Sequence, residues 1–421
     1  MRHIFLLQGV CASGKSSFIR DYELENNTLS YDAMRAMFSI NAHDSTGDES
    51  LSIRKSVQTD AIRTVERAAE YRMSNGETLF IDNTNTSRNA IKPWLALARK
   101  YDYTPHVLSF GKNLSVNDLI YRDNQRTGRD HVGEGTIRRM SEALAKYDPH
   151  PDAVHVYENH WDYVEKIVRV SNLNLDSYDE VVVVGDIQGC GNALEKMIEK
   201  IGSLEDKTRH WIFCGDFFDR GPTPEKVLDI MIHARSNVTE IEGNHERSVR
   251  HTLMGTREFK SSKETTVDVI PENRHKSLLK LVSRGVPCTF FEFGGERYFA
   301  SHAGVNFGVF DSGYWSFDTE GPWNLTSDYD FYIGGGDRDK TYTNIGTYEG
   351  NFMEDLNTST NINGIKAQFF GHRNPYNSVE EPHSLYPHLY PLENKVEFDG
   401  TLVAAVISKD GTIRYEHATE K

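Results

Sequence analysis

The chain has few cysteines, no long apolar run and no excess of positive charge. Four cysteines occur in 421 residues without a CxxC pair, which argues against a disulfide framework and fits a reducing cytoplasm. No apolar run reaches the roughly 18 residues of a membrane helix, and the short N-terminal run is expected to be a buried strand, not a signal peptide. The formal charge is −15, so the protein is expected to bind nucleic acid poorly except through a few contacts near a chain end.

The length and the order of apolar runs predict two α/β domains. A chain of 421 residues favours two domains over one. Short apolar runs alternate with helical patterns, which predicts a parallel sheet with helices packed on it. Residues 171–180 (SNLNLDSYDE) are polar and aperiodic, and the strand–loop–helix rhythm restarts directly after them. The expected strands begin with IFLLQ (4–8), TLFID (78–82) and HVLSF (106–110), and the expected boundaries are a first domain over 1–172, a linker over 173–180 and a second domain over 181–421.

The first motif is a phosphate-binding loop. GVCASGKS (9–16) matches GxxxxGK[ST] and lies between a predicted strand and a predicted helix, the context in which this motif binds phosphate. Its backbone N–H groups and the helix N-terminus can bind phosphate oxygens, while Lys15 adds a positive charge and the Ser16 hydroxyl can bind Mg²⁺. We therefore expect ATP–Mg²⁺ to be bound by Gly9, Ser13, Gly14, Lys15, Ser16 and Ser17.

Two downstream patterns could activate an acceptor for that phosphate. In SYDAMR (30–35), Asp32 and Arg35 lie one helical turn apart and share a face, so a carboxylate could accept a hydroxyl proton while the arginine holds a substrate phosphate. Taken alone, such a pair is more often a surface salt bridge. YRDNQRTGRD carries Arg122 and Arg126, four residues apart on one expected helical face, followed by Arg129. Arginines beside a nucleotide loop can neutralise a transferring phosphoryl group, although a solvated helix is the simpler reading.

In this order, the features resemble the polynucleotide 5′-hydroxyl kinases of bacterial and phage end-healing enzymes. That family shares a P-loop, a DxxR element, a strand ending in D-x-T-N and an RxxxR lid, which stand here as GVCASGKS, YDAMR, IDNTN and RDNQR. The resemblance covers about residues 1–170. It implies Asp32 as general base, Arg35 on the acceptor phosphate, Lys15 and Ser16 on ATP–Mg²⁺, and Arg122 and Arg126 as lid.

The C-terminal half carries five short motifs that each follow a strand-like run. They are GDIQG (185–189), GDFFDRG (215–221), GNHE (243–246), SHAG (301–304) and GH (371–372). Each Gly-Asp or Gly-Asn pair alone is typical of a turn. Together, carboxylates, an amide and histidines at strand ends can converge at one edge of a sheet. Hard oxygens mixed with imidazole suit a pair of Mn²⁺-like ions, which could hold a phosphate for hydrolysis.

The set resembles the binuclear metallophosphoesterases of the protein-phosphatase type over about residues 180–375. The resemblance implies an α/β domain with a two-sheet sandwich flanked by helices. It implies Asp186, Gln188 and Asp216 around a first metal, with Asp216 bridging to a second metal that Asn244, His302 and His372 complete. His245 would be the general acid, oriented by Asp219, and Arg220 would bind a phosphate oxygen. The family has His where Gln188 stands, so the affinity of the first metal and the choice between monoester and diester substrates stay open.

A phosphate-adding and a phosphate-removing module fit one purpose if they act on opposite ends of broken nucleic acid. The tandem resembles bacterial polynucleotide kinase-phosphatases, which implies ATP-dependent phosphorylation of 5′-OH ends and metal-dependent removal of 3′ or 2′,3′-cyclic phosphate from RNA or DNA. There is no KxDG ligase motif, so a separate ligase would join the ends. We expect a cytoplasmic protein with no membrane association, and a homo-oligomer is left open. Two alternatives remain: a small-molecule kinase fused to a dinucleoside-polyphosphate hydrolase, and a protein phosphatase regulated by nucleotide.

Overall fold

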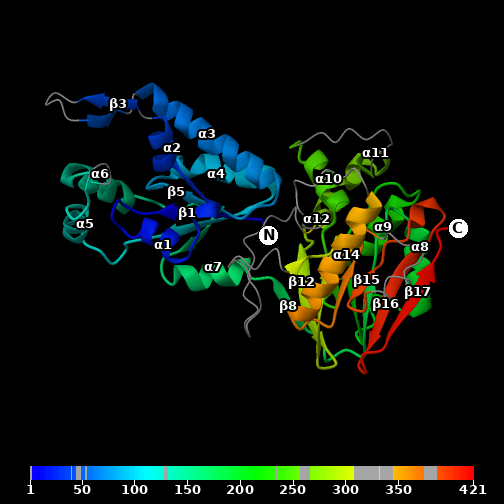
Figure 1. Ribbon diagram of the computed structural model, residues 1–421. Coiled ribbons are helices and arrows are strands. Elements are labelled where there is room, and N and C mark those ends of the chain that lie inside the picture. Colours follow the sequence, from blue (N-terminus) through cyan, green and yellow to red (C-terminus); the bar gives the residue numbers. More distant parts are fainter. Residues whose placement is uncertain are drawn as a thin grey trace. The chain divides into compact units, whose positions relative to one another are not determined.

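The computed structural model describes residues 2–38, 40–43, 49–52, 55–127, 131–233, 235–256, 266–307, 331, 345–373 and 386–421. The chain divides into two compact units, Met1–Val168 and Arg169–Lys421 (Figure 1). All four cysteines are free thiols, and three of them are buried. Among the described residues, no helix combines the length and apolar character needed to cross a bilayer.

The first unit is built on a parallel sheet. Among the described residues its strands lie in the order β2-β5-β1-β6-β7, and every pairing is parallel. The central strand β1 is fully buried from Ile4 to Leu7, as expected for a parallel strand covered on both faces. The strands are β1 His3–Gln8, β2 Thr28–Ser30, β5 Leu79–Asp82, β6 Thr104–Ser109 and β7 Val154–Val156; β3 Ile40–His43 and β4 Glu49–Ser52 form a separate antiparallel hairpin.

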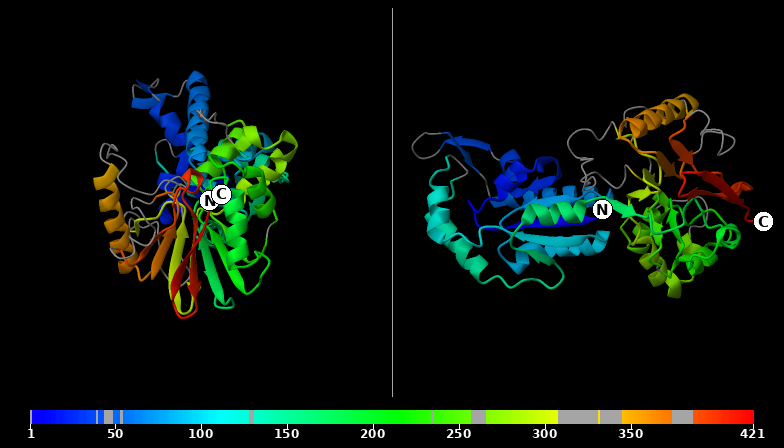
Figure 2. Two further views of the ribbon diagram at one scale, coloured as in Figure 1. Left: turned by 90° about the vertical axis from the view of Figure 1, so that its right-hand side faces the viewer. Right: turned by 90° about the horizontal axis from the view of Figure 1, so that it is seen from below.

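Helices cover both faces of this sheet (Figures 1 and 2). On one face, α3 and α4 bury an apolar cluster against β1 and β5 that includes Trp94, which is fully buried. On the other face, aromatic rings of the strands, of α1 and of α7 contact one another; Phe5 stacks between Phe80 and His106, with ring centroids 4.8 Å from each. The helices are α1 Lys15–Asp21, α2 Tyr31–Met37, α3 Lys55–Ser74, α4 Arg88–Tyr101, α5 Val116–Asp123, α6 Glu134–Ala145 and α7 His160–Val168, with a 3₁₀ turn η1 at Glu25–Asn27.

The second unit contains two sheets. In the described residues, one sheet has the order β11-β10-β9-β16-β17 and the other β15-β14-β13-β12-β8. β9, β10 and β11 are parallel, and β16 and β17 continue their sheet antiparallel. The strands are β8 Ser171–Asn174, β9 Glu180–Val184, β10 Arg209–Phe213, β11 Val238–Glu240, β12 Cys288–Phe293, β13 Glu296–Ser301, β14 Ala367–Phe370, β15 Leu389–Pro391, β16 Leu402–Ser408 and β17 Ile413–Ala418.

The two sheets pack face to face and are flanked by helices. One core lies between the sheets and joins Val183 and Ala405 of the first to Phe291 and Phe369 of the second. A second core lies between the first sheet and α8, α9 and α12, while α14 packs on the outer face of the second sheet (Figure 2, left). This confirms the expected sandwich. The helices are α8 Gly191–Ile201, α9 Pro224–Met231, α10 Asn244–Leu253, α11 Thr266–Val269, α12 His275–Val282 and α14 Ile345–Ile362, with 3₁₀ turns η3 at Glu272–Arg274 and η5 at Val396–Phe398.

The expected linker needs correction. Residues Ser171–Asn174 form β8, which pairs in parallel with β12 at the edge of the second sheet. Leu175 is buried, and its N–H donates to the carbonyl of Glu292. The segment resembles a linker in composition because β8 is an edge strand whose residues alternate between half-buried and exposed positions. The chain therefore enters the second unit directly after Val168, several residues before the expected boundary.

Candidate active sites

The phosphate-binding loop turns from β1 into α1 around Gly14. Gly14 caps the helix at φ 107°, a left-handed conformation that glycine adopts without strain. The Lys15 ammonium group donates to the carbonyl oxygens of Gly9, at 2.8 Å, and Val10, at 3.2 Å, so the lysine lies across its own loop. Burial lowers the pKa of Lys15, with Asp82 the strongest opposing charge. Lys15 is thus held within the loop that the motif predicts to bind phosphate.

A cavity of about 300 Å³ joins this loop to the other motifs of the first unit. The lining includes residues from all four segments that the sequence had singled out: the loop itself, the Asp32–Arg35 pair, the IDNTN stretch and the arginine-bearing segment. Of the expected nucleotide-binding residues, Ser13, Gly14, Lys15 and Ser16 line it, whereas Gly9, which is buried, and Ser17 lie outside the lining. The lining is Cys11, Ala12, Ser13, Gly14, Lys15, Ser16, Asp32, Arg35, Asp82, Asn83, Thr84, Arg126, Val132 and Met140.

Asp32 and Arg35 lie on the wall of this cavity as an ion pair. The Ser30 hydroxyl caps the N-terminus of α2, which places Asp32 in its first turn. An Arg35 guanidinium N–H donates to Asp32 Oδ1 at 2.6 Å. The Asp32 side chain is 86% exposed, so an acceptor hydroxyl can reach it from solvent. The pair is on the surface, as the simpler reading expected, yet it also faces the phosphate-binding loop.

Asp82 is a cavity residue that the sequence reading did not include among its candidates. It ends β5, the strand beside β1, and lines the cavity with Asn83 and Thr84. Burial raises the pKa of Asp82, and the charge of Lys15 opposes the shift. The sequence held the signal, since an apolar strand that closes on a carboxylate next to a P-loop is placed to hold a bound cation or to contact the nucleotide.

The rest of the IDNTN stretch fastens this strand end to the loop. Asn85 is fully buried at φ 45°, and its side-chain amide donates to the carbonyl of Leu7 at 2.8 Å. The Gly9 N–H donates to the carbonyl of Thr84 at 3.0 Å. The motif therefore has a structural reason in this chain: it ties the ends of two neighbouring strands together below the phosphate site.

The two lid arginines do not share a helical face. Helix α5 ends at Asp123, whose buried carboxylate accepts the N–H of Gly133 at 2.9 Å and draws the returning chain against it. Arg126 lies beyond the helix and lines the cavity, whereas Arg122 is exposed and lies outside the lining. The expectation of one helical face for Arg122 and Arg126 is therefore wrong, because the helix stops between them. Arg129 lies outside the described residues.

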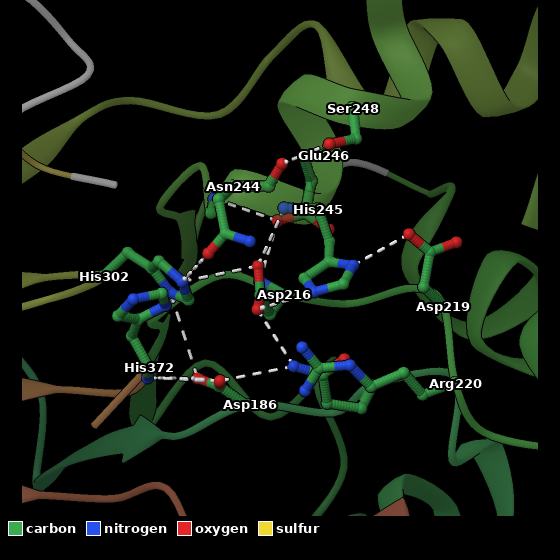
Figure 3. Close-up of polar contacts among 12 residues, drawn as sticks. Asp186, Asp216, Asp219, Arg220, Asn244, His245, Glu246, Ser248, His302 and His372 are labelled. Atoms are coloured by element: carbon green, nitrogen blue, oxygen red, sulfur yellow. Dashed lines mark hydrogen bonds and ion pairs between the residues drawn. The ribbon is translucent and has the colours of Figure 1, made fainter. Parts of the chain in front are cut away.

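In the second unit, the five motifs meet at the carboxyl edges of the two sheets (Figure 3). Asp186 follows β9, Asp216 follows β10, and Asn244 begins α10 after β11. His302 follows β13 and His372 follows β14. Parallel strands bring their carboxyl ends to one edge, so residues far apart in the sequence become neighbours. The structure brings these five side chains together, as expected.

Three of these residues form a group that could hold a metal ion. Ligand atoms of Asp216, His302 and His372 all lie within 4.8 Å of one another. His302 Nδ1 lies 2.7 Å from the carbonyl oxygen of Cys214, which leaves Nε2 3.0 Å from the side-chain oxygen of Asn244. Burial lowers the pKa of His302, and that of His372 to about 3, so both imidazoles stay neutral, as metal binding requires. These residues fit the second metal position, defined as Asp216, Asn244, His302 and His372.

The first metal position, defined as Asp186, Gln188 and Asp216, contains a different donor set. Both Asp186 oxygens lie near the backbone N–H of His372, at 3.0 and 3.1 Å. The Gln188 amide nitrogen donates to Asp216 Oδ2 at 2.9 Å and lies 3.5 Å from Asp186 Oδ2. The Gln188 side-chain oxygen is buried without a hydrogen-bond partner. The amide therefore lies between the two carboxylates, where a ligand of the first metal would be.

His245 and Asp219 form the expected dyad. His245 Nδ1 lies 2.8 Å from Asp219 Oδ2, and the backbone N–H of His245 donates to Asp216 Oδ1 at 3.0 Å. Burial disfavours the imidazolium, but the charges of Asp216 and Asp219 prevail and raise the pKa of His245 to about 9. Arg220 is 43% exposed and pairs with Glu397 at 3.1 Å. The two carboxylates thus favour the protonated form of His245 beside the metal positions.

Two glutamates belong to this site although the sequence reading did not name them. Glu246 accepts the backbone N–H groups of Asp216, Phe217 and Gly243 at 2.7 to 2.9 Å, and so fixes two motif loops to each other. Its place in GNHE was the available signal. Glu393 follows β15, and its carboxyl group contacts that of Asp186. No motif surrounds Glu393, so only the fold could reveal it.

The metal loops have unusual backbone conformations. Gln188, Asp216, Asp219, Arg220 and His372 all have φ between 49° and 71°, a region that costs free energy for residues with a side chain. Such conformations persist where surrounding contacts determine them, and they cluster at functional sites. Because five of them lie in the motif loops, the fold holds these loops in fixed shapes.

Comparisons with known proteins agree with this division. Residues 180–376 match the family described as calcineurin-like phosphoesterase, and residues 4–147 match the family described as AAA domain. A symmetrical bis(5′-nucleosyl)-tetraphosphatase of Acidovorax ebreus is 30% identical over 122 residues, 29% of this chain and 43% of the relative. A zinc-dependent endopolyphosphatase of Saccharomyces cerevisiae is 34% identical over 84 residues, 20% of this chain and 24% of the relative. The chain thus spans less than half the length of these relatives.

Solved structures give weak global similarity. A putative diadenosine tetraphosphatase covers 59% of this chain and 98% of its own, with 16% identity and a TM-score of 0.35. A putative kinase from Chloroflexus aurantiacus covers 38% of this chain and 90% of its own, with 16% identity and a TM-score of 0.27. The sequence matches and the two sites together identify the chain as an N-terminal P-loop, kinase-like domain joined to a C-terminal calcineurin-like metallophosphoesterase domain.

Proposed function

We propose that this chain is a nucleic-acid end-healing enzyme that phosphorylates 5′-OH ends at the first site and removes 3′ or 2′,3′-cyclic phosphate at the second. The observation that supports it best is the cavity shared by Lys15 and the Asp32–Arg35 pair. A nucleotide sensor needs a phosphate-binding loop, but it has no use for a carboxylate and an arginine that face it from an exposed wall. That arrangement suits an acceptor molecule that has both a hydroxyl group to be phosphorylated and a phosphate group of its own.

At the first site, the residues of the chain divide the work of phosphoryl transfer. ATP–Mg²⁺, when bound, supplies the γ-phosphoryl group. Asp32 accepts the proton of the attacking hydroxyl, and Arg35, released from Asp32, binds the acceptor phosphate. Lys15 and Arg126 neutralise charge on the transferring group.

At the second site, the residues prepare a phosphate for hydrolysis. Two divalent cations, expected to be Mn²⁺, would be held at the first and second metal positions and would supply Lewis-acid activation of phosphate and water. His245 donates its proton to the leaving oxygen, and Asp219 keeps the imidazolium charged and oriented. Arg220 can exchange Glu397 for a phosphate oxygen of the substrate.

A second candidate for the phosphoesterase is the hydrolysis of dinucleoside polyphosphates, with a small-molecule kinase in the first unit. It is favoured by the partial identity to symmetrical bis(5′-nucleosyl)-tetraphosphatases. Both candidates use the same metal positions, so they differ in substrate and not in chemistry.

A competition experiment separates the two candidates. Purified protein receives γ-labelled ATP with an equimolar mixture of 5′-OH oligonucleotides and nucleosides, and in parallel receives Mn²⁺ with 3′-phosphate oligonucleotides and diadenosine tetraphosphate. End healing predicts label on the oligonucleotide and release from its 3′ end, with RNA and DNA versions showing the preference. Label on nucleosides alone, with cleavage of the tetraphosphate alone, would establish the second candidate.

A further inference from the structure

Glu393 reaches the metal loops because of its strand. β15 pairs in parallel with β14, the strand that leads to His372, so the ends of both strands lie on one rim of the sheet. The pairing continues past the end of β15, where the Leu392 N–H donates to the carbonyl of Phe370 at 2.7 Å. Glu393 is the next residue. The topology therefore brings a carboxylate to the same edge as the other ligands.

The Glu393 carboxylate is held toward Asp186. The backbone N–H of Lys395 donates to Glu393 Oε1 at 2.8 Å, and Lys395 itself is in the left-handed region at φ 51°. This tight turn fixes one oxygen of Glu393, and the carboxyl group interacts with that of Asp186. Asp186 is buried, at 4% exposure, and Glu393 is partly buried.

Two carboxyl groups in such contact, with Asp216 nearby, can coexist in two ways. They can share a proton, or a cation can lie between them. The neighbouring amide distinguishes the two. Gln188 is 1% exposed, its nitrogen lies between Asp186 and Asp216, and its oxygen is buried without a partner. A half-turn of that amide would present a neutral oxygen between the same carboxylates, which is favourable only around a cation.

The donor groups of the first metal position also bind a cation more weakly than those of the second position. Gln188 offers a neutral oxygen, while the second position has two imidazoles. An anionic oxygen from Glu393 would compensate. We propose that Glu393 is a ligand of the first metal, together with Asp186, Gln188 and Asp216, so that this position is an all-oxygen site for a hard cation such as Mn²⁺ or Mg²⁺. The second position, with its imidazoles, accepts softer ions such as Zn²⁺ more readily.

This inference rests on the metal pair of the proposed phosphoesterase and not on its substrate, so a binding experiment tests it without turnover. Mn²⁺ binding to the full chain is measured by electron paramagnetic resonance of free Mn²⁺, without nucleotide. The wild type should bind two Mn²⁺ ions, and Glu393→Gln should weaken one of them at least about tenfold. His302→Ala should weaken the other, and Gln188→His combined with Glu393→Gln should restore the first.

Asp399→Asn is the matched control, since Asp399 lies in the same loop but pairs with Lys421 at the surface. It should bind both ions as the wild type does. If Glu393→Gln binds two ions with unchanged affinity, Glu393 is no ligand and the two carboxyl groups share a proton. Should that variant not fold, the wild type decides: after one equivalent of Zn²⁺, a single added Mn²⁺ should show no ¹⁴N coupling in pulsed spectra, and imidazole coupling there would overturn the proposal.

Discussion

The two sites of this chain are assembled in opposite ways. The phosphate-binding site of the first unit is one loop, residues 9–16, in which contiguous backbone N–H groups and one lysine form the anion site. The metal site of the second unit draws single side chains from the ends of five or more strands, spread from Asp186 to Glu393. The geometry of a contiguous loop is determined largely by its own sequence. A site built from separate strand ends forms only when both sheets have folded and packed.

This contrast predicts how each site responds to damage. The loop depends on a few local residues, and its partners Asp32, Asp82 and Arg126 add to it from outside. The metal site depends on the packing that holds its strained loops. A substitution that removes no ligand or catalytic group can therefore still disable it. Substitutions of functional side chains should affect each unit separately, whereas a substitution that alters only a loop's backbone should affect the metal site alone.

The largest expected effect comes from removing one central residue of each site. Lys15→Ala should lower phosphoryl transfer at least about a thousandfold, because the loop loses its cation, and should leave metal-dependent phosphate release unchanged. Asp216→Ala should do the reverse, since that carboxylate belongs to both metal positions. Each variant is the control for the other, assayed with labelled ATP and with a 3′-phosphate oligonucleotide. Loss of both activities in either variant would show that the sites are not independent.

The next effect distinguishes the two arginines that the sequence could not tell apart. Arg126→Ala should lower the rate constant of phosphoryl transfer about a hundredfold, because Arg126 lines the cavity. Arg122→Ala should stay within about twofold of the wild type, since Arg122 is an exposed residue outside the lining. Single-turnover kinetics with saturating ATP measure both. Equal losses in the two variants would mean that both arginines act when substrate is bound.

A change of shape alone should impair only the convergent site. The Cβ of an alanine at Gly371 would overlap the Asp186 carboxylate, so Gly371→Ala should displace this ligand and lower phosphatase activity about tenfold or more. A Cβ at Gly135, in α6, meets nothing within 4 Å, so Gly135→Ala is the matched control and should change neither activity. Full phosphatase activity in Gly371→Ala would argue that Asp186 has room to move.

The smallest effect concerns stability of the first unit in acid. His106 is buried between Phe5 and Tyr163, and burial lowers its pKa to about 4 from 6.5. As the pH falls, the unfolded chain therefore binds this proton before the folded chain does. The contribution of His106 to the free energy of unfolding is fully present above pH 6.5 and falls as the pH approaches 4. Between pH 7 and pH 5 the free energy of unfolding decreases by about 2 kcal/mol. His106→Gln should reduce this loss, as read from thermal unfolding of the first unit at both pH values.

His210 provides the control for that measurement. It is buried in the second unit beside Thr239, and burial lowers its pKa to about 4 as well. His210→Gln should leave the pH dependence of the first unit as it is in the wild type. If both variants change that dependence equally, the two units unfold as one.

Local signals in the sequence, namely strand ends and glycine-flanked polar residues, predicted the parallel sheet and the convergence of Asp186, Asp216, Asn244, His302 and His372. The sandwich was implied by the resemblance to metallophosphoesterases. It failed where the deciding contact is distant. The end of α5 depends on a buried Asp123 that accepts N–H groups from the returning chain. β8 depends on pairing with β12, more than a hundred residues later. Glu393 stands in no motif, and only the register of β15 brings it to Asp186.

The direction of β16 has a practical consequence. It runs antiparallel to β9, with Ser408 opposite Glu180, so the short turn from Lys409 to Thr412 sits at the amino end of β9, away from the metal loops at its carboxyl end. A fluorophore or surface tether attached there would report on the second unit without obstructing it. The turn at Asp410 and Gly411 is thus a suitable attachment point for single-molecule work on this protein.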